Sequence, residues 1–307
     1  MMNRFSALIL SFSLFYCLNI NAQDDLMSML QNDTKEEKPE KVIATFKTTK
    51  VVNAQSTETV KAQTLDFRIT HRFGNMGTAS NGGVHTLWGF DQAENIRFSF
   101  DYGITDRIQV GIGRSKRQEL IDGNFKIKLL EQTIDNNLPI SLVWYSNAAI
   151  TPRKDIDKIY SKTIHRLSYS HQLIAARKFG NWFSLALLPT YTHRNIVAND
   201  VNKNNNAPET NGFFSMGVAA RLKLTQRFVL VTDYFYNFSN YRINNPDKPF
   251  YNPLGVGIEI ETGGHVFHIN LTNAGGIIEN DFIPNTNDTW TKGGYKLGFN
   301  ISRVFNL

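Results

Sequence analysis

Apolar and polar residues alternate one by one through most of the chain beyond residue 62. Residues 96–100 (IRFSF) and 214–218 (FSMGV) show the pattern clearly. A period of two is typical of β-strands that have one apolar and one polar face. We predict about twelve strands, each near the roughly 9–11 residues that a tilted membrane strand needs. Their expected spans are 64–73, 95–103, 107–115, 122–131, 138–149, 163–177, 182–194, 212–224, 227–239, 253–262, 265–273 and 293–305.

The connections between these strands alternate in length. The long ones are 74–94, 150–162, 195–211, 240–252 and 274–292, and each follows an odd-numbered strand. The short ones lie near 104–106, 178–181, 225–226 and 263–264. Outer-membrane barrels combine short periplasmic turns with long external loops. The expected fold is therefore all-β: a single antiparallel transmembrane β-barrel with both termini in the periplasm. A soluble barrel or sandwich stays open as an alternative, because periodicity alone does not say which face points outward.

The first residues predict export from the cytoplasm. Residues 1–22 combine Arg4 with an apolar stretch at 7–18 and end on Ala22, as a cleaved signal peptide does. Residues 23–61 are expected to form a periplasmic leader, partly disordered, in which the β-prone stretch 42–61 is either a short hairpin or a plug strand. Residues 62–307 form the predicted barrel. The only cysteine is Cys17, so the mature chain would carry no thiol.

Composition agrees with a barrel in the outer membrane. Aromatic residues make up 12% of the chain, which favours strands. No apolar run after residue 22 is long enough for a membrane helix, so a membrane crossing requires a closed barrel. The net charge of +6 fits contact with lipid headgroups, and no nucleic-acid motif is present. The chain ends on residues 304–307 (VFNL), which resemble the signal that barrel-insertion machinery recognises.

Several short motifs resemble a known family. They are residues 45–50 (TFKTTK), 65–69 (LDFRI), 71–74 (HRFG), 90–93 (FDQA) and 100–107 (FDYGITDR). Together they are similar to a family of uncharacterised outer-membrane β-barrel proteins, classed as a domain of unknown function, over residues 42–307. The resemblance implies the barrel and its location. It supplies no catalytic residues.

Four arginines are the candidate binding residues. Three follow a histidine near the expected external end of a strand, and the alternation sends each histidine toward lipid and each arginine toward the lumen. A cationic entrance would favour small anionic solutes if the lumen holds water. Pairing with acidic residues across a closed lumen, for example Arg221 with Glu259, is the alternative. The four mouth residues are Arg72, Arg97, Arg166 and Arg194.

Signals for an enzyme, a metal site or a cofactor are weak. Ser170 and His171 are adjacent, so in a strand they face opposite sides and cannot form a catalytic pair. His265 and His268 are three residues apart, which also suits one metal ion poorly. We therefore expect no enzyme activity, and we favour a narrow outer-membrane channel or porin-like pore. The alternatives are a non-conducting barrel that binds or scaffolds a periplasmic partner, and an enzyme whose site the sequence does not reveal.

Overall fold

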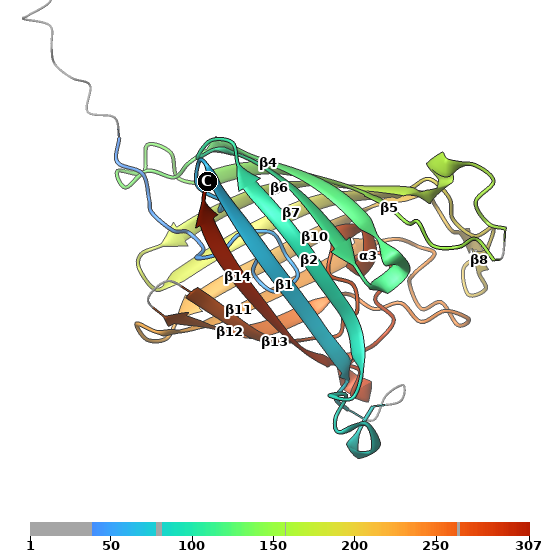
Figure 1. Cartoon of the computed structure of the whole chain (residues 1–307). Coiled ribbons are helices and arrows are strands. Elements are labelled where there is room, and N and C mark those ends of the chain that lie inside the picture. Colours follow the sequence, from blue (N-terminus) through green and yellow to red (C-terminus); the bar gives the residue numbers. More distant parts are fainter. Residues whose placement is uncertain (1–38, 78–81, 157, 263–264) are drawn as a thin grey trace, which may run out of the picture. The chain divides into compact units, whose positions relative to one another are not determined.

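Twelve antiparallel strands close into one barrel in the computed structural model (Figure 1), which describes residues 39–307 except 78–81, 157 and 263–264. The predicted signal peptide and most of the leader lie outside the described residues. Neighbouring strands follow the order β1-β14-β13-β12-β11-β10-β7-β6-β5-β4-β3-β2, and β1 pairs with both β2 and β14. The strands are β1 (Thr64–Asn75), β2 (Ala93–Gly103), β3 (Ile108–Ser115), β4 (Ile121–Leu130), β5 (Ser141–Ile150), β6 (Leu167–Phe179), β7 (Phe183–Arg194), β10 (Gly212–Lys223), β11 (Phe228–Phe238), β12 (Leu254–Thr262), β13 (His265–Thr272) and β14 (Lys296–Asn306).

The alternation has the polar face inside. In β2, Arg97 and Ser99 are buried, whereas Phe98 and Phe100 are 47% and 45% exposed. A soluble barrel has the opposite arrangement, with apolar side chains in its interior. The exposed apolar wall therefore identifies a barrel that faces lipid, and it settles the question that periodicity left open.

The two ends of the barrel differ. Strands β2 and β3, β6 and β7, and β10 and β11 are joined by short turns at one end, here called the turn end. Longer connections lie at the opposite end, here called the loop end. They contain the 3-10 turns η1 (Val84–Thr86), η2 (Arg117–Glu119), η3 (Thr163–Arg166) and η4 (Trp290–Lys292), and the hairpin of β8 (Val201–Asn202) and β9 (Ala207–Pro208). β1 starts and β14 finishes at the turn end. The predicted segregation of loops is thus confirmed. No helix among the described residues has the length and apolar character to cross a membrane.

Residues 40–61, here called the plug, begin at one end of the barrel and fill part of its lumen. The compact unit begins at Glu40, so this segment belongs to the barrel rather than to the residues before it. Phe46, Val51, Val52 and Ala54 are buried with side chains of β5, β6, β7, β10 and β11. Its backbone forms only isolated bridges, Lys50 with Gln55 and Lys41 with Thr133. The two alternatives for 42–61 are both partly met: the segment fills the lumen as a plug without forming a strand, and its tip is a tight hairpin-like turn closed by the antiparallel bridge of Lys50 with Gln55.

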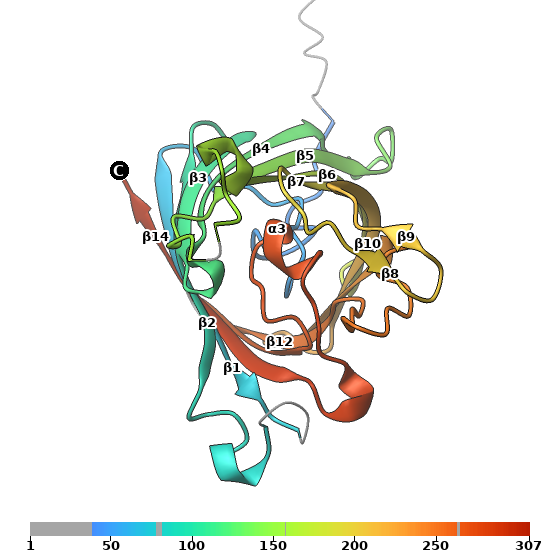
Figure 2. The same ribbon diagram turned by 90° about the vertical axis from the view of Figure 1, so that its right-hand side faces the viewer.

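A second segment fills the lumen from the loop end. The β13–β14 connection, residues 273–295 and here called the loop insert, carries the short helix α3 (Glu279–Phe282) into the barrel. Figure 2 shows α3 and the blue plug segment within the ring of strands. Ile277, Ile278, Phe282 and Ile283 are buried there. The sequence predicted this connection as a long external loop, and its apolar residues explain why it folds inward instead.

Candidate functional site: the filled barrel lumen

Many charged side chains on the lumen wall pair with one another, either between strands or within one strand. Arg97 Nη2 of β2 lies 2.6 Å from Asp122 Oδ2 of β4, and Arg68 Nη2 lies 2.8 Å from Asp66 Oδ2 within β1. Arg221 Nε of β10 lies 3.0 Å from Glu259 Oε2 of β12. All of these side chains are at most 9% exposed. Buried ions need such partners, and the predicted pairing of Arg221 with Glu259 is present.

Asp233 of β11 takes its partners from the plug instead. The backbone N–H groups of Val52, Asn53 and Ala54 all donate to Asp233 Oδ2, at 3.0, 2.5 and 2.8 Å. The Asn53 side-chain amide donates to Asp233 Oδ1 at 2.8 Å. Successive N–H groups that converge on one oxygen form a concave anion site, here occupied by a carboxylate of the protein itself. The tip of the plug is therefore shaped around this carboxylate.

Lys126 of β4 makes the opposite kind of contact. Its ammonium group donates to three plug carbonyls, those of Thr49, Ser56 and Glu58, at 3.1, 3.3 and 3.2 Å. The side chain is fully buried. An ammonium group has three donors and no acceptor, so three carbonyls match its hydrogens. Asp233 and Lys126 thus bind the plug through its backbone, which explains why the plug needs no regular secondary structure.

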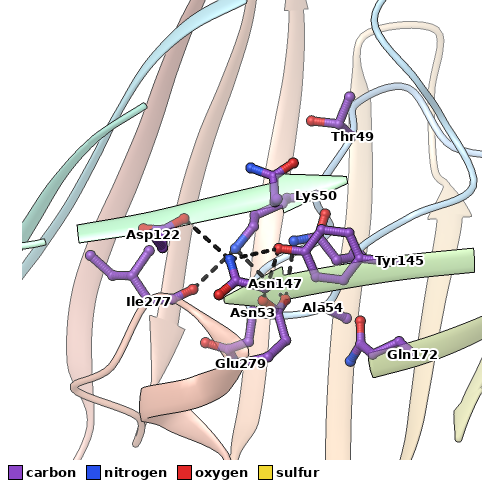
Figure 3. A network of polar contacts seen from close by, with 12 residues as sticks. Thr49, Lys50, Asn53, Ala54, Asp122, Tyr145, Asn147, Gln172, Ile277 and Glu279 are labelled. Carbon is purple, nitrogen blue, oxygen red and sulfur yellow. Dashed lines mark hydrogen bonds and ion pairs between the residues drawn. The ribbon is translucent and has the colours of Figure 1, made fainter. Parts of the chain in front are cut away.

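The plug meets the loop insert inside the barrel, and Figure 3 shows Lys50 of the plug beside Ile277 and Glu279 of the loop insert. Glu279 of α3 has no exposed surface. It accepts hydrogen bonds from Gln55 Nε2 of the plug at 3.1 Å and from Tyr145 Oη of β5 at 3.3 Å. Lys50 Nζ donates to the Ile277 carbonyl at 3.0 Å and lies 3.9 Å from Glu279 Oε1. The lumen is therefore filled from both ends.

The four candidate arginines do not come together as one ring. Arg72 and Arg97 lie inside the lumen, where Arg72 donates to Asn53 Oδ1 of the plug and to the Ala274 carbonyl of the loop insert, at 2.8 and 3.2 Å. Arg166 belongs to η3, outside β6, and donates to the carbonyls of residues 151 and 153. Arg194, at the end of β7, is 2.7 Å from Glu209. Each has partners within the protein.

A cleft of about 690 Å³ opens at the loop end. Its lining includes Tyr160, Arg194 and Phe250, together with Asn285 and Asn287 of the loop insert. Arg242 lies beside it, with its guanidinium 4.9 Å from the Phe250 ring centre. Burial, assisted by the nearby charge of Arg194, lowers the pKa of Arg242 to about 10. The cleft places part of the loop insert in contact with the medium at this end.

The plug enters at the turn end through an ionic contact. Lys41 Nζ lies 2.6 Å from Glu131 Oε2, in the connection between β4 and β5. Partial burial opposes ionisation of Glu131, but the hydrogen bond from Lys41 and the charges of Lys128 and Arg107 hold its pKa below the usual value. Lys178 Nζ donates to the Ile43 carbonyl at 2.8 Å. Residues 40–43 therefore lie against the turns, at the same end as the start of β1.

The outer wall carries one polar cluster that sequence reasoning missed. Ser146 of β5 and His171 of β6 face each other across the strand pair, with Oγ and Nδ1 2.9 Å apart. Trp144 Nε1 donates to the same Oγ at 2.8 Å. The cross-strand register brings the pair together, and the sequence offered only the adjacent Ser170. The serine oxygen accepts from Trp144 and shares a second hydrogen bond with His171, whose direction follows the histidine tautomer, so the cluster satisfies its own polar groups on the lipid-facing wall.

No group of three or more metal-binding side chains occurs among the residues that the structure describes. Several buried polar atoms of the lumen lack a protein partner, among them Ser99 Oγ, Ser170 Oγ and Asn124 Oδ1. Buried polar atoms of this kind are commonly satisfied by ordered water. The lumen chemistry is thus that of hydrogen bonds and ion pairs.

A family model described as "Membrane bound beta barrel domain (DUF5777)" matches residues 46–305. Among solved structures, the chain is similar to the NanC porin at 9% identity and a TM-score of 0.47, covering 79% of this chain and 99% of that chain. It is similar to the outer membrane protein Omp33 of Acinetobacter baumannii at 8% identity and a TM-score of 0.41, covering 82% of this chain and 100% of that chain. It is also similar to the outer membrane phospholipase A of Escherichia coli at 11% identity and a TM-score of 0.36, covering 78% of this chain and 91% of that chain. These likenesses concern the fold alone. No curated protein matches the chain significantly.

Proposed function

The chain belongs to the family of membrane-bound β-barrel domains whose model it matches, and we propose that it is an outer-membrane barrel whose narrow lumen is closed at rest by its own plug. The lipid-facing apolar wall and the predicted signal peptide support the outer membrane as its location. In that membrane the turn end faces the periplasm. The polar and charged side chains that line the lumen support a passage for small solutes rather than a catalytic centre.

The contact of Asp233 with the plug tip carries this proposal. A carboxylate that accepts three backbone N–H groups holds the plug firmly, yet every one of these bonds can be replaced by water. Both ends of the plug lie at the turn end, so it can leave without unpairing a barrel strand. On withdrawal the plug would exchange its hydrogen bonds for bonds to water and move out of the lumen, while the ring of strands would stay intact.

Removal of the plug would change the charge of the lumen. The strand-to-strand pairs stay in place, whereas Arg72 and Lys126 lose their plug contacts and Asp233 loses its own. Two cationic groups, Arg72 and Lys126, and two anionic groups, Asp233 and Glu279, would then be without their plug partners. Rings or pairs of charge at the lining set the selectivity of a pore. A preference for small anionic solutes stays part of the proposal, with Arg72 as the predicted mouth residue that contributes.

Conductance in planar bilayers tests the proposal. The wild-type barrel should be electrically silent. Asp233→Asn removes the charge that the plug tip surrounds and should produce steps of current. Asp101→Asn is the matched control, because Asp101 is another lumen carboxylate whose hydrogen bond comes from Asn124 of the barrel wall. It should stay silent. Continuous conductance by the wild type would reject a closed resting state.

A disulfide lock sharpens this test. A β-carbon added at Gly255 of β12 would lie 2.7 Å from Val52 Cγ1 at the plug tip. This proximity brings the β-carbons of a Val52→Cys and Gly255→Cys pair within reach of a disulfide. Added to Asp233→Asn, the oxidised pair should stop the current, and a reductant should restore it. A current that is the same with the cysteine pair oxidised or reduced would mean that the plug does not control the passage.

The scaffold alternative has one observation in its favour. The plug begins at the turn end, which faces the periplasm in the proposed orientation, and its first residues lie there, with Lys41 beside Glu131. A barrel that only presents these residues to a periplasmic partner would need no passage. If Asp233→Asn releases the plug tip, as its amide exchange would report, and still carries no current, the scaffold function replaces the channel.

A further inference from the structure

The plug and the loop insert share a buried carboxylate. Glu279 of α3 receives one hydrogen bond from the barrel wall, through Tyr145, and one from the plug, through Gln55. Lys50 of the plug adds its charge at 3.9 Å and donates to the neighbouring Ile277 carbonyl. Figure 3 shows Lys50, Tyr145 and Glu279 pointing toward one another from segments far apart in the sequence. The segment from one end of the barrel thus supplies partners for the segment from the other end.

A second contact joins the same two segments. The Arg72 guanidinium donates from Nη2 to Asn53 Oδ1 of the plug and from Nη1 to the Ala274 carbonyl of the loop insert. Apolar side chains of both segments, including Val52 and Phe282, belong to one buried cluster. The interface between plug and loop insert therefore combines a shared carboxylate, a shared guanidinium and shared apolar contacts.

This arrangement makes the position of each segment depend on the other. If the plug leaves, Glu279 keeps Tyr145 as its protein donor and loses Gln55 and the charge of Lys50. A buried charge that loses its partners is strongly destabilised. If the loop insert leaves instead, Lys50 loses both Glu279 and the Ile277 carbonyl. Neither segment can therefore move out alone without leaving a buried charge poorly compensated.

We propose that the loop insert is the outer half of a two-part gate, coupled to the plug through Glu279 and Lys50. Displacement of the loop insert at the loop end then releases the plug at the turn end, and withdrawal of the plug releases the loop insert. Coupling of this kind is reciprocal by thermodynamic necessity. The loop insert is accessible for such a displacement, since Asn285 and Asn287 line the cleft at the loop end. This inference rests on the proposed function, because it names the regulation of the same passage.

Hydrogen exchange of the full-length protein in lipid nanodiscs tests the coupling. The reporters are the amides of 52–54, which bond to Asp233, and those of 281–283, which bond within the loop insert. Glu279→Gln lies in the loop insert but should raise exchange at 52–54 by at least about tenfold, equivalent to about 1.4 kcal/mol. Lys50→Met lies in the plug and should raise exchange at 281–283 by a similar factor. In the double variant the two effects should be smaller than their sum.

Asp281→Asn is the matched control. Asp281 lies two residues from Glu279 on α3, but its side chain bonds Arg117 and Asn285 rather than the plug. Because this substitution leaves the Glu279 contacts with the plug intact, it should raise exchange at 52–54 by a much smaller factor than Glu279→Gln does, for a comparable rise at 281–283. Should Glu279→Gln not fold, Gln55→Met removes the direct hydrogen bond from the plug side and should raise exchange at 281–283.

The outcomes are distinct. Exchange that rises only in the segment that carries the substitution would overturn the coupling, whatever the conductance. A current from Asp233→Asn together with purely local exchange effects would keep the channel and discard the two-part gate. Coupled exchange without current in any of these variants would support the coupling between plug and loop insert and would reject the channel.

Discussion

The plug and the loop insert fill the same lumen by different means. The plug is bound largely through its backbone, with Asp233 accepting its amides and Lys126 donating to its carbonyls. The loop insert relies more on apolar packing, as in the contact of Phe282 with Phe235, whose ring centres are 5.1 Å apart. The loop insert is also joined at both ends to neighbouring strands, β13 and β14, whereas the plug is joined to the barrel only where β1 begins.

This difference indicates which segment leaves more easily. Hydrogen bonds to water replace the polar contacts of the plug, so their net contribution is small for each bond. The buried apolar side chains of the plug, Phe46, Val51, Val52 and Ala54, are mostly smaller than those of the loop insert, Ile277, Ile278, Phe282 and Ile283. Apolar burial has no such replacement, and exposing a side chain such as Phe282 costs about 1.5–3 kcal/mol. We therefore expect the plug to be the mobile half of the pair and the loop insert to be the anchored half. The following substitutions test this expectation.

Phe282→Ala should have the largest effect. It leaves a cavity beside Phe235 and should destabilise the loop insert by about 3–5 kcal/mol. Exchange at amides 281–283 should rise by about a hundredfold to a few thousandfold. Exchange at plug amides 52–54 should rise less, since Asp233 still accepts their hydrogen bonds and Lys126 still binds the plug carbonyls. Phe238→Ala is the control, because its ring is 56% exposed on the outer wall. Equal increases of exchange in both segments would show that the plug and the loop insert unfold together and would contradict the expected difference between them.

Lys126→Met should affect the plug instead. The substitution removes three donors from the carbonyls of Thr49, Ser56 and Glu58, with a cost of about 1.5–3 kcal/mol for bonds to a charged group. Exchange should rise by about tenfold to a hundredfold at the Ser56 amide, which bonds the Thr49 carbonyl. Lys128→Met is the control, two residues further along β4. If both variants behave alike, charge in the lumen rather than the specific contact holds the plug.

The wall of the barrel was far easier to predict than its contents. The twelve strands follow from a strict period of two, and lipid outside with polar groups inside imposes that period on every strand. The expected strand 293–305 corresponds to β14 at Lys296–Asn306, so the error is a few residues at the boundaries. Neither segment in the lumen obeys such a repeat, because each is held by individual contacts.

The candidate arginines show the same limit. The alternation correctly predicted that Arg72 and Arg97 face the lumen. It carries no information about what fills the lumen. Arg72 therefore resembled a free mouth residue, although it bonds Asn53 and the Ala274 carbonyl. The apolar residues Ile277, Ile278 and Phe282 within a supposed external loop were the available signal. Their burial requires a partner surface that only the closed barrel provides.

Acidification should loosen the entrance of the plug, with the smallest effect of the series. The pKa of Glu131 is depressed in the folded protein, so its contact with Lys41 stabilises the fold above the usual value of 4.5 and is lost as the pH falls through the depressed pKa. The contact is partly exposed, which limits its contribution to less than about 1 kcal/mol. Exchange at the Val42 amide, corrected for its intrinsic pH dependence, should therefore rise at most about fivefold between about pH 6 and about pH 3. Glu131→Gln should abolish this response, whereas Asp135→Asn, in the same connection, should preserve it. A response at amides 52–54 as large as that at Val42 would contradict a plug that is held at its tip by Asp233 independently of its entrance.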